Sequence, residues 1–127
     1  MNLEIRIQKT EPTRAHVWIS GRLDSSNHTD LDRELQPLLD DVDLQNLVLD
    51  LQHVDYISSA GLRSIFRARK ALGLREGRVL VVNPQPQVQK VFDIVKAVPV
   101  REIFRSVEEL DSYLDRIQAR ALDPDAD

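Results

Sequence analysis

Two adjacent serines, Ser58 and Ser59, stand where a largely apolar stretch gives way to a predicted helix. The first backbone amides of a helix have no partner within it, and the helix dipole adds partial positive charge at that end. A serine hydroxyl there can cap the helix, which is its ordinary structural role. A phosphate on Ser59 would add about −1.5 to −2 charges at a place that tolerates them. The pair is therefore either a cap or a phosphorylation site.

Other residue types that carry chemistry form no recognisable site. The histidines lie far apart and lack the spacing of a metal site: His16, His28 and His53. The four glycines form no phosphate-binding loop. Three aspartates that could be taken for a carboxylate cluster fit turn, cap and strand positions instead: Asp24, Asp50 and Asp55. We therefore expect no metal site, no cofactor and no enzymatic activity.

Composition indicates an ordinary globular protein. The chain has 127 residues, 42% hydrophobic and 30% charged, which fits one domain with a modest core. No apolar run is long enough to predict membrane insertion, and the net charge of −4 argues against nucleic acid as a partner. The absence of cysteine excludes disulfides and thiolate metal sites. The alternating N-terminus is not a signal-peptide pattern, so we expect a cytoplasmic protein.

Hydrophobic spacing predicts the elements that position the serine pair. Period-two alternation and short apolar runs are typical of strands, expected over residues 3–7, 15–19, 47–51, 78–82 and 100–104. Helical spacing predicts helices over residues 31–42, 59–72, 88–95 and 107–117. This order, β-β-α-β-α-β-α-β-α, implies an α/β fold. Its mostly parallel central sheet would have about five strands, with helices packed over it.

The ends of these elements carry their own signals. Residues 11–14 predict the first turn, and the first helix has three possible caps: Ser25, Ser26 and Asn27. Pro37 is expected to kink or shorten the first helix. Gly73 can end the helix over residues 59–72, and Ser106 lies beside the start of the last helix. We expect one domain over residues 1–120 and a short, acidic, disordered tail over 121–127.

Two arginines follow the serine pair on the same predicted helix. Arg63 and Arg67 are four residues apart and so share a helix face. They are either part of a solvated surface or part of a partner-binding surface beside Ser59.

Three segments taken together carry a family resemblance: Ile19-Ser-Gly-Arg-Leu-Asp24, then Leu47-Val-Leu-Asp-Leu51 with Val54-Asp-Tyr-Ile57, then Ser58-Ser-Ala-Gly-Leu62. With the order of elements, over about residues 3–117, they resemble the STAS domain, in particular the bacterial anti-sigma factor antagonists. The resemblance implies a STAS-type fold and a single STAS domain.

It also implies a partner switch. An unphosphorylated antagonist of this family binds a serine-kinase anti-sigma factor and releases the sigma factor. The kinase, using its own ATP, then phosphorylates a serine at the start of the second helix, and a PP2C-type phosphatase reverses this. The usual site reads Asp-Ser-Ser/Thr-Gly, which places the phosphate on Ser59, with Ser58 as a competing acceptor. In this chain Ser58 replaces the acid and Ala60 replaces the second hydroxyl residue.

The resemblance also implies a partner surface. Gly61 and Leu62 match the motif, consistent with close packing and an apolar anchor at the helix start. Asp24 matches a family aspartate that contacts the kinase, although it could instead cap the first helix. The full set is Arg22, Asp24, Ser25, Asn27, Ser58, Gly61, Leu62, Arg63 and Arg67. The altered motif leaves an alternative, a non-phosphorylated STAS scaffold or regulatory subunit of a stressosome-like or transporter-associated complex.

Overall fold

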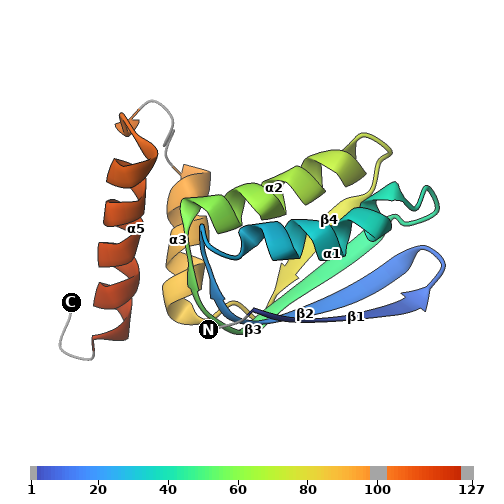
Figure 1. Ribbon diagram of the computed structural model, residues 1–127, viewed down its shortest axis with the longest axis horizontal. Coiled ribbons are helices and arrows are strands. Elements are labelled where there is room, and N and C mark those ends of the chain that lie inside the picture. Colours follow the sequence, from blue (N-terminus) through green and yellow to red (C-terminus); the bar gives the residue numbers. More distant parts are fainter. Residues whose placement is uncertain (1–2, 98–102, 124–127) are drawn as a thin grey trace.

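Four strands form a mixed sheet (Figure 1). The computed structural model describes residues 3–97 and 103–123. β1 (Glu4–Glu11) pairs antiparallel with β2 (Arg14–Leu23). β3 (Asn46–Ile57) pairs in parallel with both β2 and β4 (Arg78–Val82). The α/β class is confirmed, and the described residues form four strands rather than about five.

The fifth predicted strand and the predicted tail lie at the limits of the described residues. Of residues 100–104, only Ile103 and Phe104 are described, and neither belongs to a strand. The last helix ends at Leu122, so the first two residues of the predicted tail are helical. Residues 124–127 lie outside the described part of the chain.

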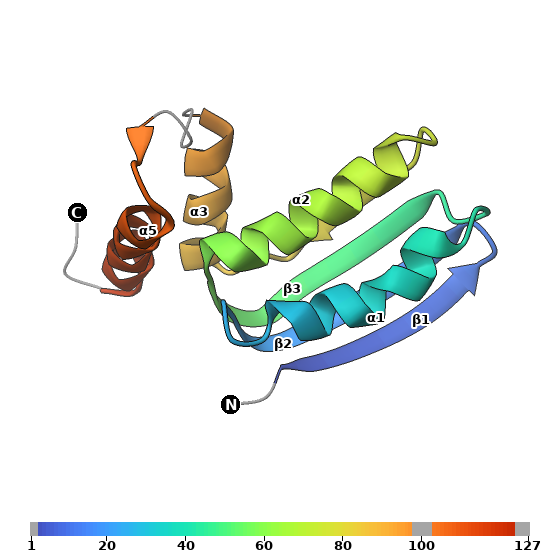
Figure 2. The same ribbon diagram turned by 45° about the horizontal axis from the view of Figure 1, so that its top comes forward.

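Within the described residues, α1 (His28–Asp40), α2 (Ser59–Gly73), α3 (Pro86–Ala97) and α5 (Val107–Leu122) pack against this sheet in two groups. α1 and α2 lie side by side over one face (Figures 1 and 2). α3 and α5 pack together beyond the end of the sheet where β3 stops and α2 begins. α1 runs through Pro37 to Asp40. α5 begins beside Ser106 as expected, and Ser106 Oγ caps it by accepting a hydrogen bond from the Glu109 amide at 3.1 Å.

The core lies between β3 and the layer of α1 and α2. Leu47, Leu49 and Leu51 of β3 are fully buried, as are Leu31 of α1 and Leu72 of α2. Each buried leucine side chain contributes about 1.5–3 kcal/mol. This burial holds α1 and α2 against β3.

β3 continues well beyond β4, and glutamine side chains bind its free edge. β4 pairs with β3 only as far as Asp50. Beyond that point, the Gln85 side chain donates to the Gln52 carbonyl at 2.8 Å and the Gln87 side chain donates to the Asp55 carbonyl at 3.0 Å. Unpaired strand edges need such partners. These contacts connect the start of α3 to the strand that leads into α2.

Candidate functional site

Ser58 caps α2. Its Oγ accepts a hydrogen bond from the Gly61 amide at 3.2 Å. Its amide donates to the Leu23 carbonyl, and its carbonyl accepts from the Leu62 amide, both at 2.9 Å. Ser58 is buried as well. Of the two roles that the sequence left open for the serine pair, the capping role belongs to Ser58, whose hydroxyl is committed to the helix.

Ser59 is the first residue of α2, and the fold does not use its hydroxyl. The Oγ is buried and has no hydrogen-bond partner among the residues that the structure describes. The Ser59 amide donates to Oδ1 of Asp111, on α5, at 2.8 Å. Buried polar atoms without a partner are uncommon and call for an explanation. Ser59 thus presents an uncommitted hydroxyl at the positively polarised end of a helix.

Gly61 lies where α2 packs closely on the sheet. A Cβ atom at this position would lie 2.8 Å from Leu23 Cγ and 3.0 Å from Ile57 Cγ1. The following residue, Leu62, is buried in the core. This close approach fixes the first turn of α2, and so both serines, against the ends of β2 and β3.

Replacing Gly61 by alanine is expected to lower the free energy of unfolding by about 1–3 kcal/mol, because the added methyl group overpacks the contact with Leu23. Gly73→Ala is the matched control at the other end of α2. Nothing lies within 4 Å of a Cβ there, so this change should be neutral or stabilising. Urea denaturation followed by circular dichroism measures both. A Gly61→Ala protein as stable as wild type would contradict the packing argument.

The connection from β2 to α1 is held by its own side chains. Asp24 Oδ1 accepts from the Ser26 amide at 2.9 Å and from the Ser26 hydroxyl at 2.6 Å. The Asn27 side chain accepts from the Asp24 amide at 2.9 Å and donates to the Arg22 carbonyl at 2.6 Å. Asn27 is therefore buried within the connection, whereas Ser25 is exposed.

The Asp24 carboxylate organises this connection and does not cap α1. Asn27 occupies the N-cap position, so the capping role considered for Asp24 is wrong. Partial burial tends to raise the pKa of Asp24, but hydrogen bonds from Ser26 and Arg22 outweigh it and hold the pKa below its usual value. Asp24 thus stays ionised, with Arg22 Nε 3.1 Å from its Oδ2.

Comparison with known families tests the resemblance directly. The sequence model of the STAS domain matches residues 4–110, which include both serines and the β2–α1 connection. The chain belongs to the STAS domain family.

One relative and two solved structures are similar to this STAS domain. The anti-sigma factor antagonist BtrV of Bordetella bronchiseptica is 37% identical over 76 residues, 60% of this chain and 65% of BtrV, so the match spans just under two thirds of that relative. An anti-sigma factor antagonist from Mycobacterium paratuberculosis has a TM-score of 0.67 at 20% identity, covering 92% of this chain and 95% of that one. SpoIIAA of Bacillus in its phosphorylated form has a TM-score of 0.63 at 15% identity, covering 79% and 96%. At these identities the two structures show a shared fold.

Predicted site residues of this STAS domain line two different depressions beside α5. The serine groove, of about 390 Å³, is lined mainly by Ser59, Leu62, Arg63, Phe66, Phe104 and Leu110. The loop groove, of about 700 Å³, is lined mainly by Arg22, Asp24, Asn27, Tyr56, Asp115 and Gln118. The structure therefore does not bring the β2–α1 connection and Ser59 into one pocket.

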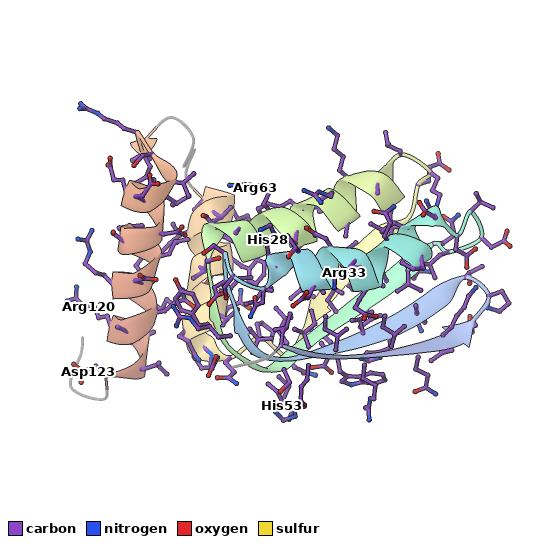
Figure 3. All side chains as sticks on the ribbon, viewed as in Figure 1. His28, Arg33, His53, Arg63, Arg120 and Asp123 are labelled. Carbon is purple, nitrogen blue, oxygen red and sulfur yellow. The ribbon has the colours of Figure 1, made fainter. Side chains whose placement is uncertain are left out.

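Arg63 and Arg67 have different surroundings. Arg63 lines the serine groove and lies near the beginning of α2 (Figure 3). Arg67 pairs with Asp32 of α1, with Nη1 3.2 Å from Oδ2. An exposed pair of this kind contributes about 0–1 kcal/mol. Arg63 is thus a cation beside Ser59, whereas Arg67 belongs to the contact between α1 and α2.

Polar side chains of α5 bind the segment that leads from β3 into α2. Asp111 accepts from the Ser59 amide, and Asp115 accepts from the Tyr56 hydroxyl. Gln118 binds both backbone groups of Ile57, accepting from the amide at 3.0 Å and donating to the carbonyl at 2.8 Å. Their spacing places the three on one helix face. We call this set the α5 clamp: Asp111, Asp115 and Gln118.

Tyr56 connects the α5 clamp to the β2–α1 connection. The Arg22 guanidinium lies over the Tyr56 ring, 3.5 Å from its centroid. Burial, together with the hydrogen bond to the Asp115 carboxylate, raises the pKa of Tyr56. The phenol therefore remains protonated and donates to Asp115 at neutral pH. Neither Tyr56 nor any residue of the α5 clamp was predicted from the sequence to be part of the site.

The three histidines lie in different parts of the structure. His16 stacks on Trp18 with ring centroids 4.0 Å apart, and His28 Nδ1 lies 3.5 Å from Asp32 Oδ2. His53 points away from the layer of α1 and α2 (Figure 3). Within residues 3–97 and 103–123, no group of three or more His, Cys, Asp or Glu could hold a metal ion. None of the helices described there has the length and apolar character needed to cross a bilayer.

Proposed function

We propose that this STAS domain is an anti-sigma factor antagonist in a partner-switching pathway. When unphosphorylated it binds a serine-kinase anti-sigma factor in the cytoplasm, and phosphorylation of Ser59 inactivates it. Its role is regulatory rather than enzymatic. The observation that carries the proposal is the uncommitted hydroxyl of Ser59 in the first turn of α2.

Local geometry supports Ser59 over Ser58 as the acceptor. Ser58 Oγ is already engaged by the Gly61 amide, and Ser58 is buried, so phosphorylation there would have to disrupt an existing capping hydrogen bond. Phosphorylation of Ser59 removes no hydrogen bond made by its side chain to a described residue. In that step Oγ displaces ADP from the γ-phosphorus of the kinase's ATP and gives up its proton, and a PP2C-type phosphatase later hydrolyses the ester. The 37% identity to an anti-sigma factor antagonist supports the antagonist role, and SpoIIAA, which shares the fold, has been solved in a phosphorylated form.

Burial divides the proposed partner surface into contacting and supporting residues. Asn27, Ser58, Gly61 and Leu62 are buried, so they position the surface rather than touch a partner. The residues proposed for contact are the half-buried Asp24 and four exposed residues, Arg22, Ser25, Arg63 and Arg67.

The test is the mass of the protein isolated from its own cells. We expect a fraction to carry one phosphoryl group that phosphatase treatment removes, and peptide mapping should place it on Ser59. Ser59→Ala should abolish the modification, whereas Ser112→Ala, at an exposed position on α5, should not. A protein that stays unmodified during growth and stress would contradict the proposal.

The burial of Ser59 Oγ favours a second candidate, a STAS scaffold or regulatory subunit that is never phosphorylated. Such a subunit would remain in a large stressosome-like or transporter-associated complex throughout purification. Ser59→Ala and Ser59→Asp would then both leave that association unchanged.

A further inference from the structure

The described arrangement shields the hydroxyl of Ser59 from a kinase. Ser59 is 7% exposed, and its Oγ is buried. Phosphoryl transfer requires the attacking oxygen and the leaving oxygen to lie roughly in line with the phosphorus, so the kinase has to reach Oγ from solvent. Some element at the start of α2 therefore has to move. α5 binds there through Asp111.

Asp111 and a phosphate on Ser59 would compete for one donor. The Ser59 amide is held by Asp111 Oδ1 at 2.8 Å. A phosphate on the same residue brings acceptor oxygens to the free amides at the helix start, where the helix dipole favours them. Two anions at this separation also repel each other. The Ser59 amide can therefore donate its hydrogen bond to Asp111 in the unmodified protein or to the phosphate in the modified protein.

The serine groove offers the phosphate cationic partners. Arg63 follows Ser59 by four residues on α2, and Arg105 lines the same groove just before α5. Guanidinium groups bind phosphate through charge-assisted hydrogen bonds. A phosphate directed into the groove gains these partners, whereas Asp111 loses the amide to which it was bound.

We propose that α5 is a latch on the phosphorylation site and that phosphorylation of Ser59 releases its first two turns, residues 107–113. The proposal rests on the function proposed above and names the element that responds to the modification. The rest of α5 stays attached, because Gln118 still binds Ile57 and Leu114 remains in the core. With the latch closed Ser59 is hidden, and with phosphoserine in place the latch stays open.

Hydrogen exchange of the full chain tests the latch. Phosphoserine is incorporated at position 59 during synthesis, and exchange is compared with that of the unmodified protein. We expect exchange over residues 107–113 to rise about tenfold or more, because a charge-assisted hydrogen bond is lost. Exchange over residues 114–122 and over α2 should change much less. The same readout with Asp111→Ala and no phosphate should reproduce the loosening.

Two further variants separate repulsion from general destabilisation. Asp111→Asn keeps an oxygen for the Ser59 amide but removes the charge, so phosphoserine should loosen the latch less in this protein. Glu108→Gln, at an exposed acid on the same turns, should leave the effect of phosphoserine unchanged. No change over residues 107–113, or a uniform rise over the whole chain, would overturn the proposal. Because phosphoserine is incorporated during synthesis and needs no kinase, a protein never phosphorylated in its cells would refute the proposed function and leave this result standing.

Discussion

Ser59→Asp is expected to weaken binding to the proposed partner, a serine-kinase anti-sigma factor, about tenfold or more, corresponding to a loss of about 1.4 kcal/mol or more. Ser59→Ala should keep the affinity of the unphosphorylated protein within about twofold. The hydroxyl makes no hydrogen bond to a described residue, so its loss changes little in the free protein. A carboxylate there has to be desolvated when a partner packs on the serine groove. Isothermal titration with the purified kinase measures both affinities.

Ser112→Asp is the matched control for added charge. It introduces the same side chain at an exposed position on α5, a residue that lines neither groove. Its affinity should equal that of wild type, and thermal unfolding of all three variants checks that each is folded. A Ser59→Asp protein that binds the kinase as tightly as wild type would refute the partner switch at this residue.

The sequence predicted the sheet and helices where one local pattern dominates. Ile5 and Ile7 alternate with polar residues, and in the structure they lie opposite Ile19 and Val17. The prediction failed at the far end of β3. Gln52 and His53 are both exposed and break the alternation after Leu51, and the register with β2 shifts nearby. The continuation to Ile57 depends on pairing with β2, which no local pattern reports.

The candidate site was partly predictable for a similar reason. The serine pair and Gly61 lie within four residues of one another and mark a helix start. Which serine caps the helix depends on the exact residue at which the helix begins, and the sequence does not fix this residue. Asp111 carries no local sign that it binds Ser59, which is 52 residues earlier. The α5 clamp looks like an ordinary polar face beside the apolar positions of the last helix. Only tertiary packing turns it into part of the site.

Gln118→Ala is expected to lower the free energy of unfolding by about 2–4 kcal/mol, because it leaves two buried backbone groups of Ile57 without partners. The Gln118 side-chain amide makes the two backbone hydrogen bonds that a neighbouring strand would otherwise make at this edge of β3. Gln89→Ala is the matched control, since this exposed glutamine side chain bonds to Asp93 on its own helix, at 2.8 Å, and its loss should cost less than about 0.5 kcal/mol. Urea denaturation compares the three proteins.

The pH dependence of the stability of Gln118→Glu distinguishes the contributions of the two hydrogen bonds to Ile57. An ionised carboxylate can accept from the Ile57 amide but cannot donate to the Ile57 carbonyl, whereas a neutral carboxyl can do both. Burial therefore raises the folded-state pKa of this glutamate above its unfolded value of about 4.3. The stability deficit relative to wild type should be smallest near about pH 4 and should grow as the pH rises toward neutrality. A deficit independent of pH would mean that the carbonyl bond is not needed, and that the apolar side of α5 alone holds it against the segment entering α2.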